Sequence, residues 1–89
     1  MALFEANNHE TIEAAPQGGA PDALLQLGLQ YCSGRDVPLD MIEAHKWFNL
    51  AAMRGSDAAR RYRQEIATEL SRTELGLAQR RAREWLSTH

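Results

Sequence analysis

Apolar residues recur at three- and four-residue spacing along most of the chain after residue 20, the period of α-helices that bury one face. The first helix is expected from about Pro21 to Ser33, because proline suits the first helical position and Gly34 suits the left-handed residue that closes a helix. It carries two apolar stripes: Leu24, Leu27 and Tyr31, and Leu25, Leu29 and Cys32. A helix that is apolar on two sides needs neighbours on both.

The second helix is expected to begin after Asp40. Its carboxylate can accept a hydrogen bond from the backbone N–H of Glu43, and Glu43 can return one to the N–H of Asp40, a variant of the capping box. The apolar face is Ile42, Ala44, Trp47, Phe48, Ala51 and Ala52, and Gly55 ends the helix. Gly28 in the first helix costs about 1 kcal/mol relative to alanine. We therefore predict that another helix approaches closely at Gly28.

Two further helices are expected in the C-terminal part of the chain. Ser56 caps one that runs to about Leu70, and Ser71 with Glu74 forms the capping box of the last. Their apolar stripes are Ala59, Tyr62, Ile66 and Leu70, and Leu75, Ala78, Ala82, Trp85 and Leu86. Since no segment alternates with the period of a β-strand, the sequence predicts an all-α fold of about four helices in antiparallel hairpins.

Residues 1–20 differ in character from the rest of the chain. They are mostly small or polar, and the run from Pro16 to Gly19 breaks any helix before it. We predict a flexible N-terminal arm over residues 1–20 and one helical domain over residues 21–89.

A set of spaced residues also carries a family resemblance. Its members are Ala23, Leu27-Gly28, Tyr31, Gly34, Val37, Asp40, Ala44, Trp47-Phe48, Ala51-Ala52, Gly55 and Ala58. In this set the central stretch resembles the Sel-one-like repeat family, relatives of the tetratricopeptide repeat, over about 36 of the 89 residues. Asp36 stands where the second loop glycine is usual, and aspartate tolerates a left-handed backbone better than most residues.

The resemblance implies a fragment of a right-handed, tetratricopeptide-like α-solenoid. Residues 21–56 would be one repeat, and residues 57–89 a divergent capping helix pair. It implies a non-catalytic protein–protein interaction module, an adaptor, scaffold or regulatory subunit, and no enzymatic chemistry.

In such repeats ligands often lie on the concave surface, which points to Gln26 and Gln30 as exposed groups that bond a partner's backbone. Leu25 and Leu29 lack a preceding repeat to cover them. Their cover would be the arm, a second copy of the chain or a different protein.

Charge supports one alternative. The net charge is −2, but residues 1–45 carry −6 and residues 46–89 carry +4. Seven arginines dominate the second half: Arg60, Arg61, Arg63, Arg72, Arg80, Arg81 and Arg83. This Arg-rich face would allow nucleic-acid binding. The interleaved glutamates and the pI of about 5.9 argue against it.

The remaining composition points away from other classes. Cys32 is the one cysteine, so no internal disulfide forms, and His9, His45 and His89 lack metal-ligand spacing. No apolar run approaches the roughly 20 residues that span a bilayer. We therefore expect no catalytic, cofactor or metal-binding residues, no membrane insertion and a cytoplasmic location.

Overall fold

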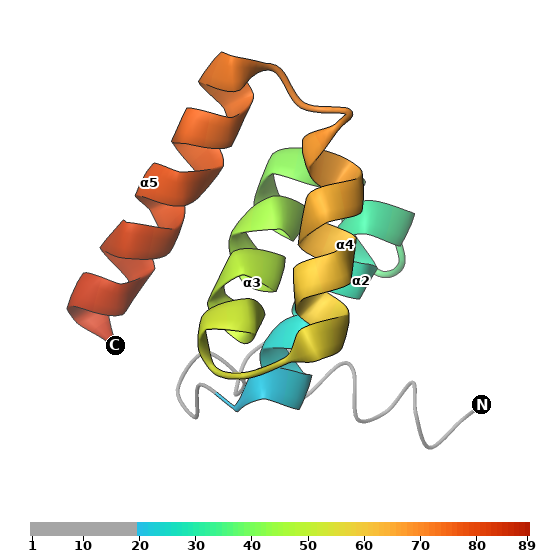
Figure 1. The fold of residues 1–89 in the computed structure, drawn as a ribbon. Coiled ribbons are helices and arrows are strands. Elements are labelled where there is room, and N and C mark those ends of the chain that lie inside the picture. The colour runs from blue at the N-terminus through green and yellow to red at the C-terminus, as the bar shows by residue number, and fades with distance from the viewer. Residues whose placement is uncertain (1–19) are drawn as a thin grey trace.

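The computed structural model describes residues 20–89, and this part of the chain is all-helical, without a β-strand. Four helices follow one another: α2 (Pro21–Ser33), α3 (Met41–Met53), α4 (Asp57–Ala67) and α5 (Arg72–Thr88) (Figure 1). The all-α prediction is confirmed for these residues. The predicted arm lies outside them, apart from Ala20.

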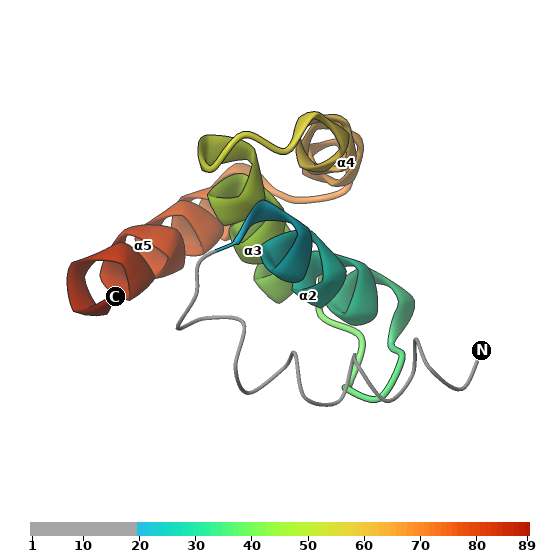
Figure 2. The ribbon, with the colours of Figure 1, turned by 90° about the horizontal axis from the view of Figure 1, so that it is seen from below.

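Helix α3 is the central element of the fold. Each of the other three helices packs mainly on α3 rather than on its remaining neighbours. Seen from below, α2, α4 and α5 lie around α3, with α4 and α5 on different sides of it (Figure 2). Residues 57–89 therefore attach to the rest of the fold through α3, and α4 and α5 make few contacts with each other.

The C-terminal end of α2 and the start of α3 are determined by the backbone conformation and side-chain hydrogen bonds of nearby residues. Gly34 is left-handed with φ 72°, and its N–H donates to the carbonyl of Gln30 at 2.8 Å. Asp36 is also left-handed, with φ 64°, as expected. The Asp40 carboxylate accepts from the N–H groups of Ile42 and Glu43 at 3.1 and 3.0 Å. Both predicted caps of the α2–α3 connection are confirmed.

The predicted return bond from Glu43 to Asp40 is wrong. The N–H of Asp40 donates instead to the carbonyl of Tyr31 at 3.0 Å, so it has no need of a side-chain partner. The Glu43 carboxylate contacts Lys46 at 3.1 Å and Arg81 at 3.0 Å. Glu43 thus joins α3 to α5 rather than capping α3.

The caps of the last two helices are confirmed. The Ser56 hydroxyl accepts from the N–H of Ala59 at 3.1 Å. Ser71 and Glu74 form the reciprocal capping box, with bonds of 3.1 and 2.8 Å. Helix α4 ends at Ala67, before the predicted Leu70. It ends early because residues 68–70 form turns with bonds to the third preceding carbonyl.

The close approach predicted at Gly28 is present. A Cβ atom built there would lie 2.5 Å from two ring carbons of Phe48, so only glycine admits this ring. Phe48 itself is fully buried. The helical cost of Gly28 is therefore accompanied by a close packing contact between α2 and α3.

Helix α5 attaches through small residues and one aromatic contact. Ala78 and Ala82 are buried, and Trp85 is 8% exposed. Its ring and that of Trp47 form a T-shaped contact, with centroids 5.8 Å apart and planes at 77°. Trp47 is 6% exposed, as its place in the predicted apolar face requires.

Candidate functional site

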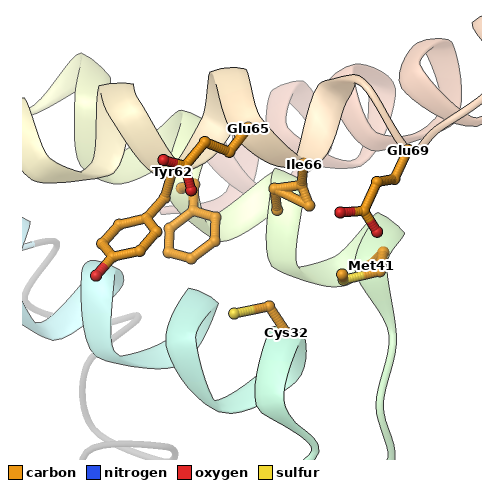
Figure 3. Close-up of a pocket in the computed structure, with 7 residues that line it drawn as sticks. Cys32, Met41, Tyr62, Glu65, Ile66 and Glu69 are labelled. Atoms are coloured by element: carbon orange, nitrogen blue, oxygen red, sulfur yellow. The ribbon is translucent and has the colours of Figure 1, made fainter.

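A hollow of about 200 Å³ opens between α2, α3 and α4. We call it the α2–α4 pocket. Its lining residues come from all three helices and the turn after α4: Cys32, Met41, Phe48, Tyr62, Glu65, Ile66 and Glu69 (Figure 3). Most of this lining is apolar or aromatic, so the pocket suits an apolar group of a ligand.

Two aromatic rings form one wall of the pocket. Phe48 on α3 and Tyr62 on α4 stack with centroids 5.2 Å apart and planes at 15°. Phe48 is held on its other side by the notch at Gly28. Tyr62 is 38% exposed, so part of its ring is open to a ligand. The wall is therefore buried at Phe48 and accessible at Tyr62.

The opposite part of the pocket is formed by α2 and the start of α3. Cys32 projects from α2 into the pocket, with its sulfur directed to the side of Tyr62 and away from Met41 (Figure 3). Its Sγ donates to the carbonyl of Leu29 at 3.5 Å. Burial raises the pKa of the Cys32 thiol, so it stays protonated at neutral pH. A protonated thiol is a poor nucleophile, and Cys32 contributes an apolar surface to the pocket.

Two carboxylates give the pocket its charge. Glu65 and Glu69 are exposed, and neither side chain has a hydrogen-bond or ion-pair partner among residues 20–89. No lysine, arginine or histidine belongs to the lining residues. The pocket therefore combines an apolar interior with an acidic rim.

The predicted partner-binding residues lie elsewhere. The expectation that Gln30 is exposed is wrong, since the residue is 3% exposed and its Nε2 has no partner in the described part of the chain. Gln30 follows Leu27 by three residues, so it lies on the same side of α2 as the buried residues Leu24 and Leu27. Gln26 is half-buried.

Leu25 and Leu29 are half-buried and pack against the core cluster. None of the four predicted residues lines the α2–α4 pocket. Cys32, which shares their stripe, does line it.

The pocket residues on α4 were missed as a site at the sequence level. Glu65, Ile66 and Glu69 follow Tyr62 by three, four and seven residues, so they share one face of α4 and of the turn after it. The signal was present as an apolar stripe flanked by acids. The sequence did not show that α2 and α3 would complete the hollow.

The Arg-rich face predicted for nucleic acid is divided. Three of its arginines bond within the molecule: Arg60 to Asp57 at 3.3 Å, Arg63 to Asn49 at 2.8 Å and Arg81 to Glu43 at 3.0 Å. The other four are exposed, one on α4 and three on α5, as follows: Arg61, Arg72, Arg80 and Arg83. Since α4 and α5 lie on different sides of α3, the structure supplies no argument for one continuous basic surface.

His45 is the buried titratable group of the core. It is 3% exposed, and its Nδ1 has no partner within residues 20–89. Burial lowers the pKa of His45, and the charge of Arg63 lowers it further. The imidazole is therefore neutral at neutral pH and contributes to packing.

Two further properties concern the described residues as a whole. Residues 20–89 contain no cluster of three or more side chains able to hold a metal ion. Within the same range, no helix combines the length and apolar character needed to cross a membrane.

Comparison of the chain with protein-family models, curated proteins and solved structures gives no match. The Sel-one-like resemblance therefore stays a prediction from the residues that carry it.

Proposed function

We propose that this protein is a non-catalytic protein–protein interaction module, an adaptor or regulatory subunit that binds a partner's peptide segment in the α2–α4 pocket. The observation that carries the proposal is the pocket itself, an apolar hollow formed jointly by three helices with an aromatic wall. Its volume of about 200 Å³ lies below the range of about 300–1,000 Å³ usual for small-molecule sites. A hollow of this size suits one or two side chains of a bound polypeptide.

The resemblance to Sel-one-like repeats supports the same function. A tetratricopeptide-like arrangement, with residues 21–56 as one repeat, would make the α2 side of the pocket part of a concave surface. The left-handed residues Gly34 and Asp36 occur where the repeat loop would require them. We also propose a cytoplasmic location, since the unpaired Cys32 suits a reducing compartment.

The test is selection of a displayed library of random short peptides on the full chain. Peptides that bind the α2–α4 pocket should lose affinity with Tyr62→Ala, which removes the accessible part of the aromatic wall. Gln79→Ala, an exposed change on α5, is the matched control and should leave affinity unchanged. Circular dichroism should show equal helix content in both variants.

Cys32 supplies a second, independent measurement. Because it is the one thiol and lines the pocket, a bound peptide should slow its alkylation. Selected peptides that neither depend on Tyr62 nor protect Cys32 would contradict the proposed site. Self-association would appear in sedimentation as a mass above that of one chain, and Tyr62→Ala should not change it if the pocket serves a different protein.

A further inference from the structure

We infer that the segment bound in the α2–α4 pocket is basic, with one large apolar side chain flanked by lysine or arginine. This inference rests on the proposed function and adds the chemical class of the partner. It depends on the acidic rim, Glu65 and Glu69, to which residues 20–89 supply no counter-charge.

The two rim carboxylates are arranged along one wall. Glu65 and Glu69 lie on either side of Ile66 at the mouth of the pocket (Figure 3). Glu69 lies just after the end of α4 at Ala67, and four residues correspond to about 6 Å along an α-helix and about 8 Å along a 3₁₀-type turn. Two residues of an extended peptide span about 6.6 Å. A peptide with basic residues two apart, and an apolar residue between or beside them, could therefore reach both carboxylates and the apolar interior together.

The electrostatics favour cations over anions at this site. The seven lining residues carry two formal negative charges and no positive charge. Neither carboxylate is paired within residues 20–89. A basic ligand would gain complementary contacts, whereas an acidic ligand would meet like charges beside an apolar surface.

The chain's own segments match this chemistry less well. Residues 1–20 contain three acids, Glu5, Glu10 and Glu13, and no lysine or arginine. The exposed arginines of α5 have no exposed apolar residue between them, because Leu75 and Leu77, which follow Arg72, are half-buried. A second copy does offer exposed apolar side chains, Leu39 and Met53, but each lies within four residues of an aspartate, Asp40 and Asp57 respectively. A different protein is the occupant that the charges favour.

The experiment uses peptides selected on the full chain and judged pocket-dependent by Tyr62→Ala and Cys32 protection. They should contain leucine, methionine or an aromatic residue with lysine or arginine within a few positions. Their affinity should fall as salt rises, because exposed charge pairs are screened. The double variant Glu65→Lys/Glu69→Lys should weaken binding by about tenfold or more and favour peptides with acidic flanks.

The matched control is Asp22→Lys/Glu84→Lys, which makes the same change in net charge at exposed positions outside the pocket. It should alter affinity by less than about threefold, because charges beyond a Debye length are largely screened.

Pocket-dependent peptides with neutral or acidic flanks, unaffected by the charge reversal, would overturn the inference while leaving the proposed function in place. If no peptide passes the two pocket criteria, the proposed function itself fails. A synthetic peptide of residues 1–20 that binds in trans as tightly as the selected peptides would also overturn the basic-partner inference.

Discussion

The α2–α3 pair and the attachment of α5 to α3 achieve close packing by different means. In the α2–α3 pair the backbone makes room, since Gly28 leaves a notch that the Phe48 ring fills. At α5 the small side chains Ala78 and Ala82 allow the approach, and the Trp47–Trp85 contact fills the volume. The ion pair between Glu43 and Arg81 adds a polar contact at the edge.

This difference teaches where each junction is vulnerable. The α2–α3 junction tolerates no added atom at one backbone position, whereas the α3–α5 junction depends on keeping two large rings. Helix α3 contributes a large aromatic residue to each junction, Phe48 to one and Trp47 to the other. Each junction can therefore be disrupted separately by a substitution on the outer helix, at Gly28 on α2 or at Trp85 on α5.

The largest effect is expected from the tryptophan contact. Trp47→Ala should lower the free energy of unfolding by about 3–5 kcal/mol, because it removes a buried ring and leaves a cavity. Urea denaturation followed by circular dichroism measures this loss. Trp85→Ala should instead raise hydrogen exchange in α5 far more than in α2. Equal exchange increases in both helices would show that the two junctions are not separable.

Gly28→Ala should be the next most damaging change. Alanine gains about 1 kcal/mol in helix propensity, but overpacking against Phe48 costs about 1–3 kcal/mol. We expect a net loss in urea denaturation despite the better helix former. In the double variant with Phe48→Leu the two losses should be less than additive, because the clash partner is gone. Strict additivity would mean that the ring is not what restricts position 28.

Removing a helix cap should lower the free energy of unfolding by a smaller amount, and by a similar amount for α3 and α5. Ser71→Ala removes the cap of α5, and Asp40→Ala removes that of α3. Each should cost about 1 kcal/mol in thermal or urea unfolding. Thr73→Ala is the control, since Thr73 is exposed in the first turn of α5, whose cap is formed by Ser71 and Glu74. A loss at Thr73 equal to that at Ser71 would remove the capping explanation.

The smallest effect at neutral pH concerns His45, because its contribution changes only on acidification. Burial lowers the folded-state pKa of His45 below the usual 6.5, so the unfolded chain binds the proton first. Stability should be constant above about pH 6.5 and fall as the pH drops from there to the folded pKa.

Urea denaturation across this range should show that loss in the wild type. His45→Gln should lose less stability on acidification, whereas His89→Gln should behave as the wild type. A steeper acid loss in His45→Gln would contradict this origin.

Local chemistry made much of the helical framework predictable. Pro21, Gly34, Asp40 and Ser71 act through the backbone within a few residues, so their roles could be predicted without knowing the tertiary structure. Gly28 was predictable for a related reason, because a helical glycine without a local purpose indicates a close neighbour.

Apart from the end of α4, which local turns determine, the misses depend on which helix meets which. Glu43 pairs with Arg81 far along the chain, and Gln30 is covered although glutamine is usually exposed. The pocket needs residues from three helices, and its acidic rim becomes meaningful only when Glu65 and Glu69 are seen beside Phe48. Periodicity identifies a face, but it does not say what the face meets.

Phe48 takes part both in the packing of α2 on α3 and in the lining of the α2–α4 pocket. This limits which changes of ligand specificity the protein can acquire by substitution. Its ring fills the notch in α2, stacks on Tyr62 and also lines the space offered to a ligand. Any substitution there would loosen the junction while it reshapes the binding surface. New specificities are therefore more accessible through the outward positions of α4, where residues can vary at little structural cost.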